Sequence, residues 1–458
     1  MQRNDFLKLV GLGSAAFLLT SFKPFKLDKS KGKVIIIGAG MAGASAAFYL
    51  NQEGFEIEIL EARDRIGGRV HTFEEWGHPI ELGAGFIHRG SPESDLIWKE
   101  SQKLNLLTKA TDFEKTMLFD QNGGKIAKSN LIKFYDRKFE PAVLKASQEV
   151  KNIFSDISLE DIFENKNFIS KVNDQEKVII DFIMQGYQNS INTNLKNASA
   201  KYYLEEAIMG SEGNDQAMLG GFVNIIEAHL KGIRVNFNSP VIEIDDLGNK
   251  VVVKTENDTY EADYVVVSVP LSILRSQEIK FNPDLPPWKK EAFNQIGTGQ
   301  FNKIVMKFSE KFWKGNNDAF FFSSEIKDSF GLTVNWDKYS NQPILIAMPV
   351  ADAALWVEKQ DAETIRKKWV NILHKAFPRK NIEIVDLLTT HWVSDSYSQG
   401  AYSYTPVGSS KEMFNAIAES VGRIHFAGEA TSPLSNGTVH GAYASGLREA
   451  KNISNPYK

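Results

Sequence analysis

The sequence predicts an α/β fold with a doubly wound parallel sheet, because its first clear element is a strand that turns directly into a helix. Residues 33–37 form an apolar run, and a helical run follows at residues 44–52. Between them, Gly38 allows a tight turn, Gly40 lets the backbone approach a pyrophosphate, and Gly43 lets the helix pack closely on the strand. This order predicts a Rossmann-like, dinucleotide-binding unit.

A second predicted strand, residues 56–60, supports the same fold. It ends on Glu61, about 20 residues past the glycines, where an acidic side chain that binds a ribose hydroxyl is expected. The free N–H groups and the positive end of the first helix would then face the phosphates. A glycine-rich turn without a ligand is the alternative, and the position of Glu61 argues against it.

Composition limits the other functions. The chain has 458 residues, a formal net charge of −4 and no cysteine. Its length allows a large core and two domains, and it carries no long basic run of the kind that binds nucleic acid. Without cysteine there are no disulfides, thiolate metal sites or cysteine nucleophiles. The eight histidines show no metal-ligand spacing, so we expect no metal site.

The first 27 residues are typical of a signal peptide. Arg3 and Lys8 precede an apolar run at residues 9–20, which is too short to span a bilayer. The segment from Arg3 to Lys8 is similar to a twin-arginine export signal with Asn4 in place of the second arginine. We therefore expect a periplasmic or secreted protein without a stable membrane span. The alternative is an uncleaved apolar arm on a cytoplasmic protein.

Three further segments are rich in glycine or in aromatic residues. The sequence RIGGR follows the acidic strand, and adjacent glycines there let the backbone pass close to a ligand while a guanidinium pairs with phosphate oxygens. The sequence ELGAGFIH, residues 81–88, offers small residues that could lie against a flat ring. Near the C-terminus, W-x-x-D-x-x-S-x-G-x-Y begins at Trp392, and FAGEATSPLSNGTVHGAYASGLREA covers residues 426–450.

Together these motifs resemble the flavin-dependent amine oxidases, a family that includes monoamine oxidases, polyamine oxidases, lysine-specific histone demethylases and L-amino-acid oxidases. The resemblance runs from about Lys33 to the C-terminus and is weakest in the middle. The C-terminal motif is most similar to the polyamine oxidase and histone demethylase branch. The resemblance implies an FAD cofactor, which must be bound without a covalent thioether because the chain has no cysteine.

The resemblance also implies the site residues. Cofactor contacts are expected from Gly38, Gly40, Met41, Ala42, Gly43, Glu61, Ala62, Arg63, Gly68, Arg69, Gly83, Ala84, Gly85, Phe86, Val241, Trp392, Gly428, Glu429, Thr438 and Val439. Four side chains are expected at the reaction centre: Lys303, Trp392, Tyr402 and His88. The family's lysine holds a water against the flavin, and the GxxNK pattern assigns this role to Lys303 rather than to Lys307. His88 could bind or tune a substrate amine, or be a structural histidine.

The resemblance further implies a discontinuous, two-domain architecture. We expect an FAD-binding domain from residues 33–95, 218–296 and 395–458, and an α+β substrate-binding domain from residues 96–217 and 297–394. In the weakly patterned middle, residues 176–188 and 197–209 are predicted to be amphipathic helices. Residues 251–255 and 263–269 are predicted strands, and residues 437–452 contain the last helix.

The implied reaction is hydride transfer from an amine to the flavin, which gives an imine and then an aldehyde or ketone. Dioxygen would be the second substrate and hydrogen peroxide a product. Whether the amine is a polyamine or a monoamine stays open, as does the oligomeric state. Three alternatives remain: an L-amino-acid oxidase, a flavin desaturase or isomerase acting on a lipid, and an FAD-binding scaffold without turnover.

Overall fold

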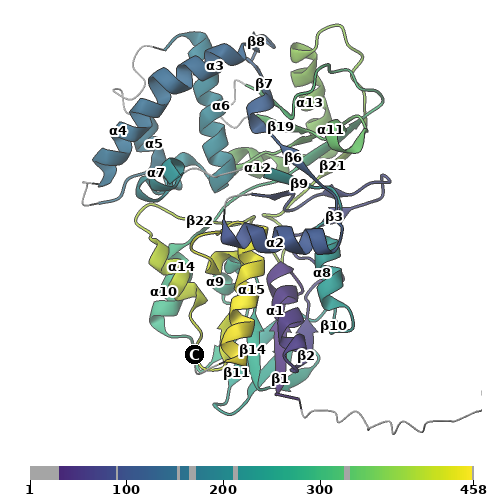
Figure 1. Cartoon of the computed structure of the whole chain (residues 1–458), viewed down its shortest axis with the longest axis vertical. Coiled ribbons are helices and arrows are strands. Elements are labelled where there is room, and N and C mark those ends of the chain that lie inside the picture. Colours follow the sequence, from purple (N-terminus) through teal and green to yellow (C-terminus); the bar gives the residue numbers. More distant parts are fainter. Residues whose placement is uncertain are drawn as a thin grey trace, which may run out of the picture.

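The computed structural model of the chain describes residues 30–88, 91–151, 155–164, 172–209, 215–323 and 331–455. The predicted signal peptide, residues 1–27, lies outside the described residues. The chain forms two lobes stacked along its longest axis (Figure 1). The lower lobe holds the first strand and the last helix, so the two ends of the described chain meet in it.

A five-stranded sheet forms the centre of the lower lobe. Its order is β10 (Arg234–Asn236), β2 (Glu56–Leu60), β1 (Lys33–Ile37), β14 (Tyr264–Val267) and β23 (Ile424–Phe426), and every neighbouring pair is parallel. From the central strand β1, the sheet extends to one edge through β2 and β10 and to the other edge through β14 and β23. This confirms the predicted α/β, doubly wound fold, and the carboxyl ends of β1 and β14 are the place where such folds bind ligands.

Both faces of this sheet are buried. Val34 and Ile36 of β1 pack with α1 (Met41–Gln52), α8 (Val223–Leu230) and α15 (Val439–Ser454), whereas the alternate residues of β1 pack into a second core. Because successive side chains of a strand point to opposite faces, a continuous apolar run is what a sheet covered on both sides requires.

The second face is covered by a smaller sheet and by helices. The sheet has the order β13 (Thr259–Ala262), β12 (Val251–Thr255), β11 (Val241–Asp246) and β15 (Lys280–Asn282). The helices are α9 (Leu271–Ser276), α10 (Pro287–Gln295) and α14 (Lys411–Ala418). The strands predicted at residues 251–255 and 263–269 are β12 and β14.

The upper lobe contains a seven-stranded sheet. Its order is β21 (Ile384–Thr389), β17 (Ile304–Phe308), β20 (Ile344–Ala347), β19 (Leu332–Asn335), β18 (Ala319–Phe322), β7 (Thr116–Phe119) and β8 (Lys125–Ile126). Its strands therefore come from both segments that the sequence assigns to the substrate-binding domain. The domain boundaries themselves stay a prediction.

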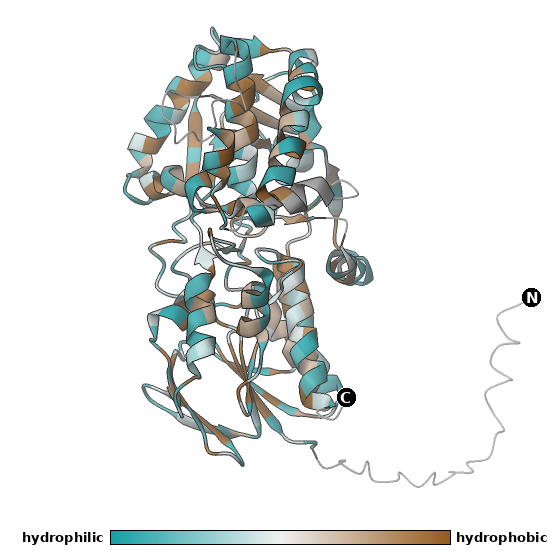
Figure 2. Ribbon diagram, turned by 90° about the vertical axis from the view of Figure 1, so that its left-hand side faces the viewer, coloured by the Kyte–Doolittle hydropathy of each residue, from teal (hydrophilic) through white to brown (hydrophobic). Residues whose placement is uncertain are grey.

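Helices surround this sheet, and their apolar residues, brown in Figure 2, face the interior of the lobe. They are α3 (Lys128–Phe134), α4 (Glu140–Lys151), α5 (Leu159–Phe163), α6 (Asp174–Ile191), α7 (Ala200–Met209), α11 (Asp337–Ser340), α12 (Ala351–Glu358) and α13 (Ala362–Ala376). Single turns, η1 to η4, lie at Phe113–Lys115, Tyr135–Phe139, Leu195–Asn197 and Glu429–Thr431. Helices α6 and α7 are the two amphipathic helices predicted for the middle of the chain.

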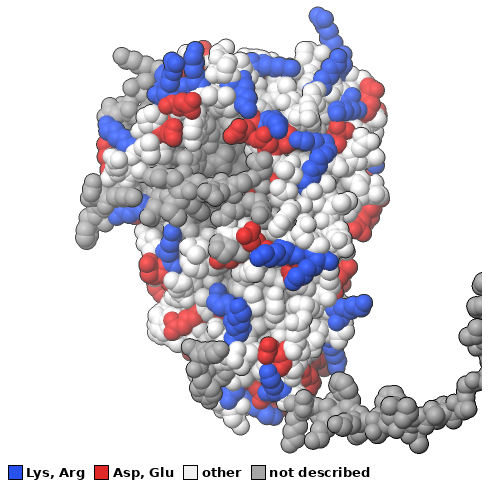
Figure 3. Space-filling view, in the orientation of Figure 1, with Lys and Arg blue, Asp and Glu red and all other residues white. Residues whose placement is uncertain are grey.

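Short strands and one helix join the lobes (Figure 1). They are β3 (Thr72–Phe73), β4 (Ile80–Glu81), β5 (Phe86–Ile87), α2 (Pro92–Lys103), β6 (Thr108–Thr111), β9 (Asp215–Met218), β16 (Gly297–Thr298) and β22 (Ser403–Tyr404). Acidic and basic side chains are interspersed over the face shown in Figure 3. Within the described residues, no helix combines the length and the apolar content needed to cross a bilayer.

Candidate active site

The glycine turn after β1 is built for a close approach. Gly38 has a φ of +101°, which favours glycine, and a Cβ on Gly43 would lie 2.0 Å from the carbonyl oxygen of Gly38. Gly40 is the N-cap of α1, and no side chain caps this helix end. Met41 and Ala42 are buried in the first turn of α1. The uncapped N–H groups of this turn are the donors that a pyrophosphate would satisfy.

Glu61 is fixed by the backbone that surrounds it. Its carboxylate accepts hydrogen bonds from the N–H groups of Ala39, at 2.7 Å, and Arg63, at 2.9 Å. Each oxygen keeps a lone pair, so a ribose hydroxyl can still donate to this buried carboxylate. A cavity of about 200 Å³ opens beside Ala62 and Pro240, next to Val241 at the start of β11. The predicted adenosine-side residues are therefore brought together here.

The two predicted arginines both bind partners within the chain. Arg63 forms a bidentate pair with Asp395, with N···O distances of 2.7 and 2.5 Å, and its guanidinium lies 5.4 Å from the centre of the Tyr397 ring. Burial lowers the pKa of Arg63, but Asp395 outweighs it and raises this pKa above its usual value. Arg69 donates to Glu429 at 2.9 Å and to the carbonyl oxygen of Ala401. Both guanidiniums therefore tie the N-terminal glycine loop to the C-terminal motif.

Glu429 joins three segments. One carboxylate oxygen accepts from Arg69, and the other accepts from the Ser403 hydroxyl at 2.6 Å and from the Gly437 N–H at 2.7 Å. The next segment opens α15, whose N-cap Thr438 accepts from the Gly441 N–H. A Cβ on Gly428 would meet no atom within 4 Å, so space is open beside this residue. Glu429 positions the loop that precedes α15.

Lys303 lies at the floor of the site, between the lobes. Its Nζ donates to the carbonyl oxygens of Glu81 and Gly83, each at 2.7 Å, and lies 3.1 Å from the position of a Cβ on Gly85. The side chain is buried, and burial lowers its pKa below that of an exposed lysine. One ammonium N–H is left over among these contacts, so Lys303 can hold a water or a ligand atom.

Asn302 fixes the positions of Lys303 and Trp392 relative to each other. Its side-chain oxygen accepts from the Trp392 N–H and from the Thr390 hydroxyl, each at 3.0 Å. Thr390 in turn accepts from the Lys303 N–H at 2.8 Å. The Trp392 indole N–H donates to the Leu82 carbonyl oxygen, so the buried ring lies against the same ELGAG segment that Lys303 contacts.

Tyr402 and Phe301 supply aromatic surface near Lys303 and Trp392. Their ring centres are 6.0 Å apart, and the Tyr402 hydroxyl donates to the Asn189 carbonyl oxygen at 2.6 Å. Burial raises the pKa of Tyr402, so the hydroxyl stays protonated. A Cβ on Gly437 would lie 2.8 Å from the Tyr402 ring, which places this ring against the loop before α15.

His88 belongs to a cluster of three ionisable side chains. Its Nδ1 lies 2.9 Å from the Asp215 carboxylate, and its ring centre is 6.4 Å from that of His440. Desolvation lowers the pKa of His88, although its side chain is 54% exposed, but the hydrogen bond and charge of Asp215 outweigh this effect and raise the pKa above its usual value. The pKa of His440 falls to about 3 because of burial and the nearby His88, so this ring is neutral. Its Nδ1 is buried and has no partner among the described residues.

These contacts form one continuous path that fits a dinucleotide-linked ring. Gly40 pairs with Gly67, the Arg69 carbonyl oxygen accepts from Ala84, and Gly83 accepts from Lys303. The path begins at the carboxyl end of β1 and ends between the lobes, with Gly68 and Phe86 along it. The uncapped N-terminus of α1 and the glycines, which have no side chains, match the phosphates of FAD. The unpartnered nitrogen of His440 matches the polar edge of the FAD ring. Met41, Ala42, Val439 and Thr438 lie at the two helix ends that flank it.

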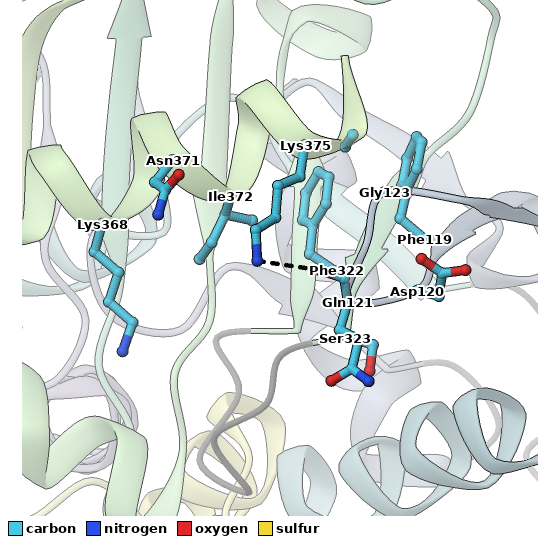
Figure 4. A pocket seen from close by; sticks show the side chains of 11 residues that line it. Phe119, Asp120, Gln121, Gly123, Phe322, Ser323, Lys368, Asn371, Ile372 and Lys375 are labelled. Atoms are coloured by element: carbon cyan, nitrogen blue, oxygen red, sulfur yellow. Dashed lines mark hydrogen bonds between the residues drawn. The ribbon is translucent and has the colours of Figure 1, made fainter. Parts of the chain in front are cut away.

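A separate cavity of about 170 Å³ lies in the upper lobe, between α13 and the ends of β7 and β18 (Figure 4). Lys368, Asn371 and Lys375 line its α13 side, and Lys375 donates to the Gln121 carbonyl oxygen. None of the predicted site residues lines this cavity. It is therefore distinct from the candidate active site.

Three residues of the site were not singled out by sequence reasoning. Glu81 stands inside the ELGAG motif, and its carboxylate is buried beside Lys303. Asn302 precedes the predicted lysine directly. Asp215 lies 127 residues from His88 and meets it only because β5 pairs with β9. The motif pattern could have indicated the first two residues, but no local signal indicates Asp215.

Comparisons with known proteins identify the family of the chain. The sequence model of the family described as "Flavin containing amine oxidoreductase" matches residues 41–454. Polyamine oxidase 2 of Arabidopsis thaliana is 32% identical over 91% of this chain and 87% of its own length. Polyamine oxidase 3 of rice, Oryza sativa subsp. japonica, is 30% identical over 91% of this chain and 88% of its own length.

A second group of relatives is longer than this chain. Lysine-specific histone demethylase 1 homolog 2 of Arabidopsis thaliana is 31% identical over 94% of this chain, but the match covers 60% of that protein. The family match, the relatives and the path from the glycine turn to Lys303 lead to one conclusion. The chain belongs to the flavin-containing amine oxidoreductases, and it is an FAD-dependent amine oxidase.

Proposed function

We propose that this amine oxidase acts on polyamines, with dioxygen as electron acceptor and hydrogen peroxide as product. The observation that carries the proposal is the similarity to several proteins named polyamine oxidases, which extends over nearly the whole chain. The His88–Asp215 pair gives secondary support, because it carries a net negative charge above the His88 pKa, where Asp215 would attract a substrate with more than one ammonium group.

The residues of the chain have separable roles in this proposal. When bound, FAD accepts the hydride from the amine carbon. Trp392 and Tyr402 orient the amine by aromatic contact and by cation–π attraction. Lys303 holds a water or the flavin edge with its remaining N–H, and Asn302 keeps Lys303 and Trp392 at fixed positions. His440 is neutral, so it can donate to or accept from a ligand without adding charge.

The test is anaerobic mixing of the purified holoenzyme with spermine, spermidine, N-acetylated polyamines, simple monoamines and L-amino acids. Loss of the oxidised flavin absorbance reports reduction by each compound. We expect fast bleaching by one or more polyamines and peroxide formation when air is admitted. Bleaching by monoamines alone, or by L-amino acids alone, would overturn the polyamine assignment. No bleaching by any amine would favour the desaturase or scaffold alternatives.

Three arginines of the glycine-rich loop have partners within the chain, which weakens the L-amino-acid oxidase alternative. A substrate carboxylate usually requires a guanidinium partner. Arg63 and Arg69 bind Asp395 and Glu429, and Arg65 donates to the carbonyl oxygens of Ile66 and Gly68. The guanidiniums of these three arginines are therefore already hydrogen-bonded to groups within the chain, rather than to a substrate carboxylate.

We also propose that the chain is exported through its twin-arginine-like N-terminal segment, which would deliver a folded, FAD-loaded protein. The support is the sequence pattern of residues 3–24. The test is fractionation of the native cells followed by N-terminal sequencing. Protein in the cytoplasm that still carries Met1 would contradict the proposal.

A further inference from the structure

We propose that Glu81 and Lys303 form a buried proton store that gains one proton when the bound flavin is reduced and loses it when the flavin is reoxidised. Glu81 is the group that changes protonation, whereas Lys303 stays charged. The inference requires bound FAD, but it does not depend on which amine is the substrate.

Glu81 and Lys303 are buried next to the same glycine of the flavin path. Glu81 is 1% exposed and Lys303 is 5% exposed. The Lys303 ammonium donates to the main-chain carbonyl oxygen of Glu81, and a Cβ on Gly85 would lie 3.1 Å from Lys303 Nζ and 3.4 Å from Glu81 Cβ. One small residue of the flavin path therefore borders both side chains.

The hydrogen bonding of the Glu81 carboxyl is incomplete. One oxygen accepts from the Phe222 N–H at 2.6 Å and from the Thr72 hydroxyl at 3.0 Å. The other oxygen is buried and has no partner among the described residues. A buried carboxylate without full hydrogen bonding is costly, which favours uptake of a proton on the unpartnered oxygen.

Glu81 and Lys303 influence each other's charge. Burial raises the pKa of Glu81 and lowers the pKa of Lys303, so the two values move toward each other. The other ionisable group that acts on Glu81 is Glu74, in the exposed turn between β3 and β4. Strand β3 and the residue before α8 contribute Thr72 and Phe222, which carry no charge.

Charge added to the flavin would be compensated by this pair. Hydride transfer brings two electrons and one proton to the ring, and it leaves the ring with one negative charge. Glu81 compensates by taking one proton from solvent, so that its carboxylate becomes a neutral carboxyl while Lys303 stays charged. Reduction of dioxygen to hydrogen peroxide removes the hydride equivalent and needs one further proton. Glu81 supplies this proton and returns to the carboxylate.

The test measures the midpoint potential of the bound flavin against pH, with electrochemical reduction through mediator dyes and no amine present. The slope counts the protons taken up with each electron pair. In the wild-type holoenzyme we expect more than one proton per electron pair around neutral pH. In Glu81→Gln, which keeps the size of the side chain but cannot titrate, we expect one proton per electron pair over the same range.

Two further variants complete the test. Glu74→Gln removes the same charge from the exposed turn and should keep the wild-type slope. Glu81→Asp retains a titrating carboxyl and should restore a slope above one. The proposal is overturned if Glu81→Gln keeps the wild-type slope, or if the wild type takes up a single proton per electron pair at every pH. If Glu81→Gln does not retain FAD, Glu81→Met, which also cannot titrate, takes its place in the test and carries the same expected slope.

The same measurement is independent of the polyamine assignment. A protein that no polyamine reduces can still show the steep slope that Glu81 predicts. Conversely, if the protein oxidises polyamines but its flavin takes up only one proton per electron pair, the proposed function stands and the proton store at Glu81 is overturned.

Discussion

The side-chain oxygen of Asn302 accepts the backbone N–H of Trp392 at 3.0 Å, although the two residues are 90 positions apart. The same oxygen accepts from Thr390, which holds the backbone of Lys303. The aromatic wall and the buried ammonium of the site are thus fixed by one amide. Because of this arrangement, we expect Asn302 to affect the rate of amine oxidation although it has no direct chemical role.

We expect Asn302→Ala to lower kcat/KM about 10- to 100-fold, because losing about 1.4–2.8 kcal/mol of transition-state stabilisation has this effect. The measurement is steady-state kinetics with the best amine, together with the FAD content of the purified variant. Asn194→Ala is the matched control, because Asn194 bonds to Asp352 at an exposed position. An equal kcat/KM in Asn302→Ala and wild type would show that the hydrogen bonds of Asn302 are not needed for catalysis.

Lys303→Met should keep FAD bound but slow turnover about 100-fold or more, since a preorganised buried cation often contributes on this scale. Methionine keeps most of the aliphatic stem and removes the donor to Glu81 and Gly83. Rapid-mixing measurements of flavin reduction and reoxidation would identify the step that slows. Lys307→Met, on the same strand, serves as the control and should have wild-type kinetics.

Asp215→Asn should shift the ionisation of His88 to lower pH. In the wild type the His88 pKa is raised above its usual value, so the charged form, and its ion pair with Asp215, persist below that pKa. The stability that the pair contributes is therefore present at acidic pH and is lost as the pH rises through the His88 pKa. Removing the Asp215 charge leaves only the effect of burial, which lowers the pKa.

The measurement is an NMR titration of the histidine ring signals in both proteins, with His88→Gln to assign the signal. His78 provides an internal reference, because its pKa depends on burial, a backbone hydrogen bond with Trp76 and the charge of Lys307, and not on Asp215. An unchanged His88 pKa in Asp215→Asn would show that Asp215 does not raise the pKa of His88.

Gly43→Ala should weaken FAD binding at least about tenfold, which corresponds to about 1.4 kcal/mol. The added methyl group would lie 2.0 Å from the Gly38 carbonyl oxygen, so α1 must move away from the glycine turn. Fluorescence titration of the apoprotein with FAD gives the Kd. Gly186→Ala is the control, because a Cβ there meets no atom within 4 Å, and it should leave the Kd unchanged.

Lys289→Met should destabilise the lower lobe by about 2–3 kcal/mol, the usual contribution of hydrogen bonds to a charged group. Lys289 is fully buried, and its Nζ donates to the carbonyl oxygens of Ala416, Ile417 and Glu419 at the C-terminal end of α14. The midpoint of thermal unfolding measures the loss. Lys290→Met, at the exposed neighbouring position, should unfold at nearly the wild-type temperature.

The sequence predicted the sheet, the cofactor and the family because these depend on local patterns. The glycine turn, the acid at Glu61 and the strands β1 and β2 all lie within one βαβ unit. Even there, α1 begins at Met41 rather than at residue 44, because Gly43 belongs to the first turn of the helix. The glycine motif had indicated a turn up to that residue.

The rest of the site depends on pairings between distant strands. Asp215 reaches His88 through the β5–β9 register, and Lys289 reaches α14 across 128 residues. Arg63 and Arg69 were expected to contact the cofactor, but their partners Asp395 and Glu429 become neighbours only in the folded chain. Such contacts leave no periodic signal in a single sequence.

The strand order β10–β2–β1–β14–β23 has a consequence for synthesis on the ribosome. Strand β23 lies at residues 424–426, and it is followed by the loop and helix that close the far side of the cofactor path. The nucleotide-binding lobe therefore cannot close before residues 424–454 have emerged from the ribosome. We expect FAD to be captured only after α15 has been synthesised, so the N-terminal βαβ unit remains without ligand until then.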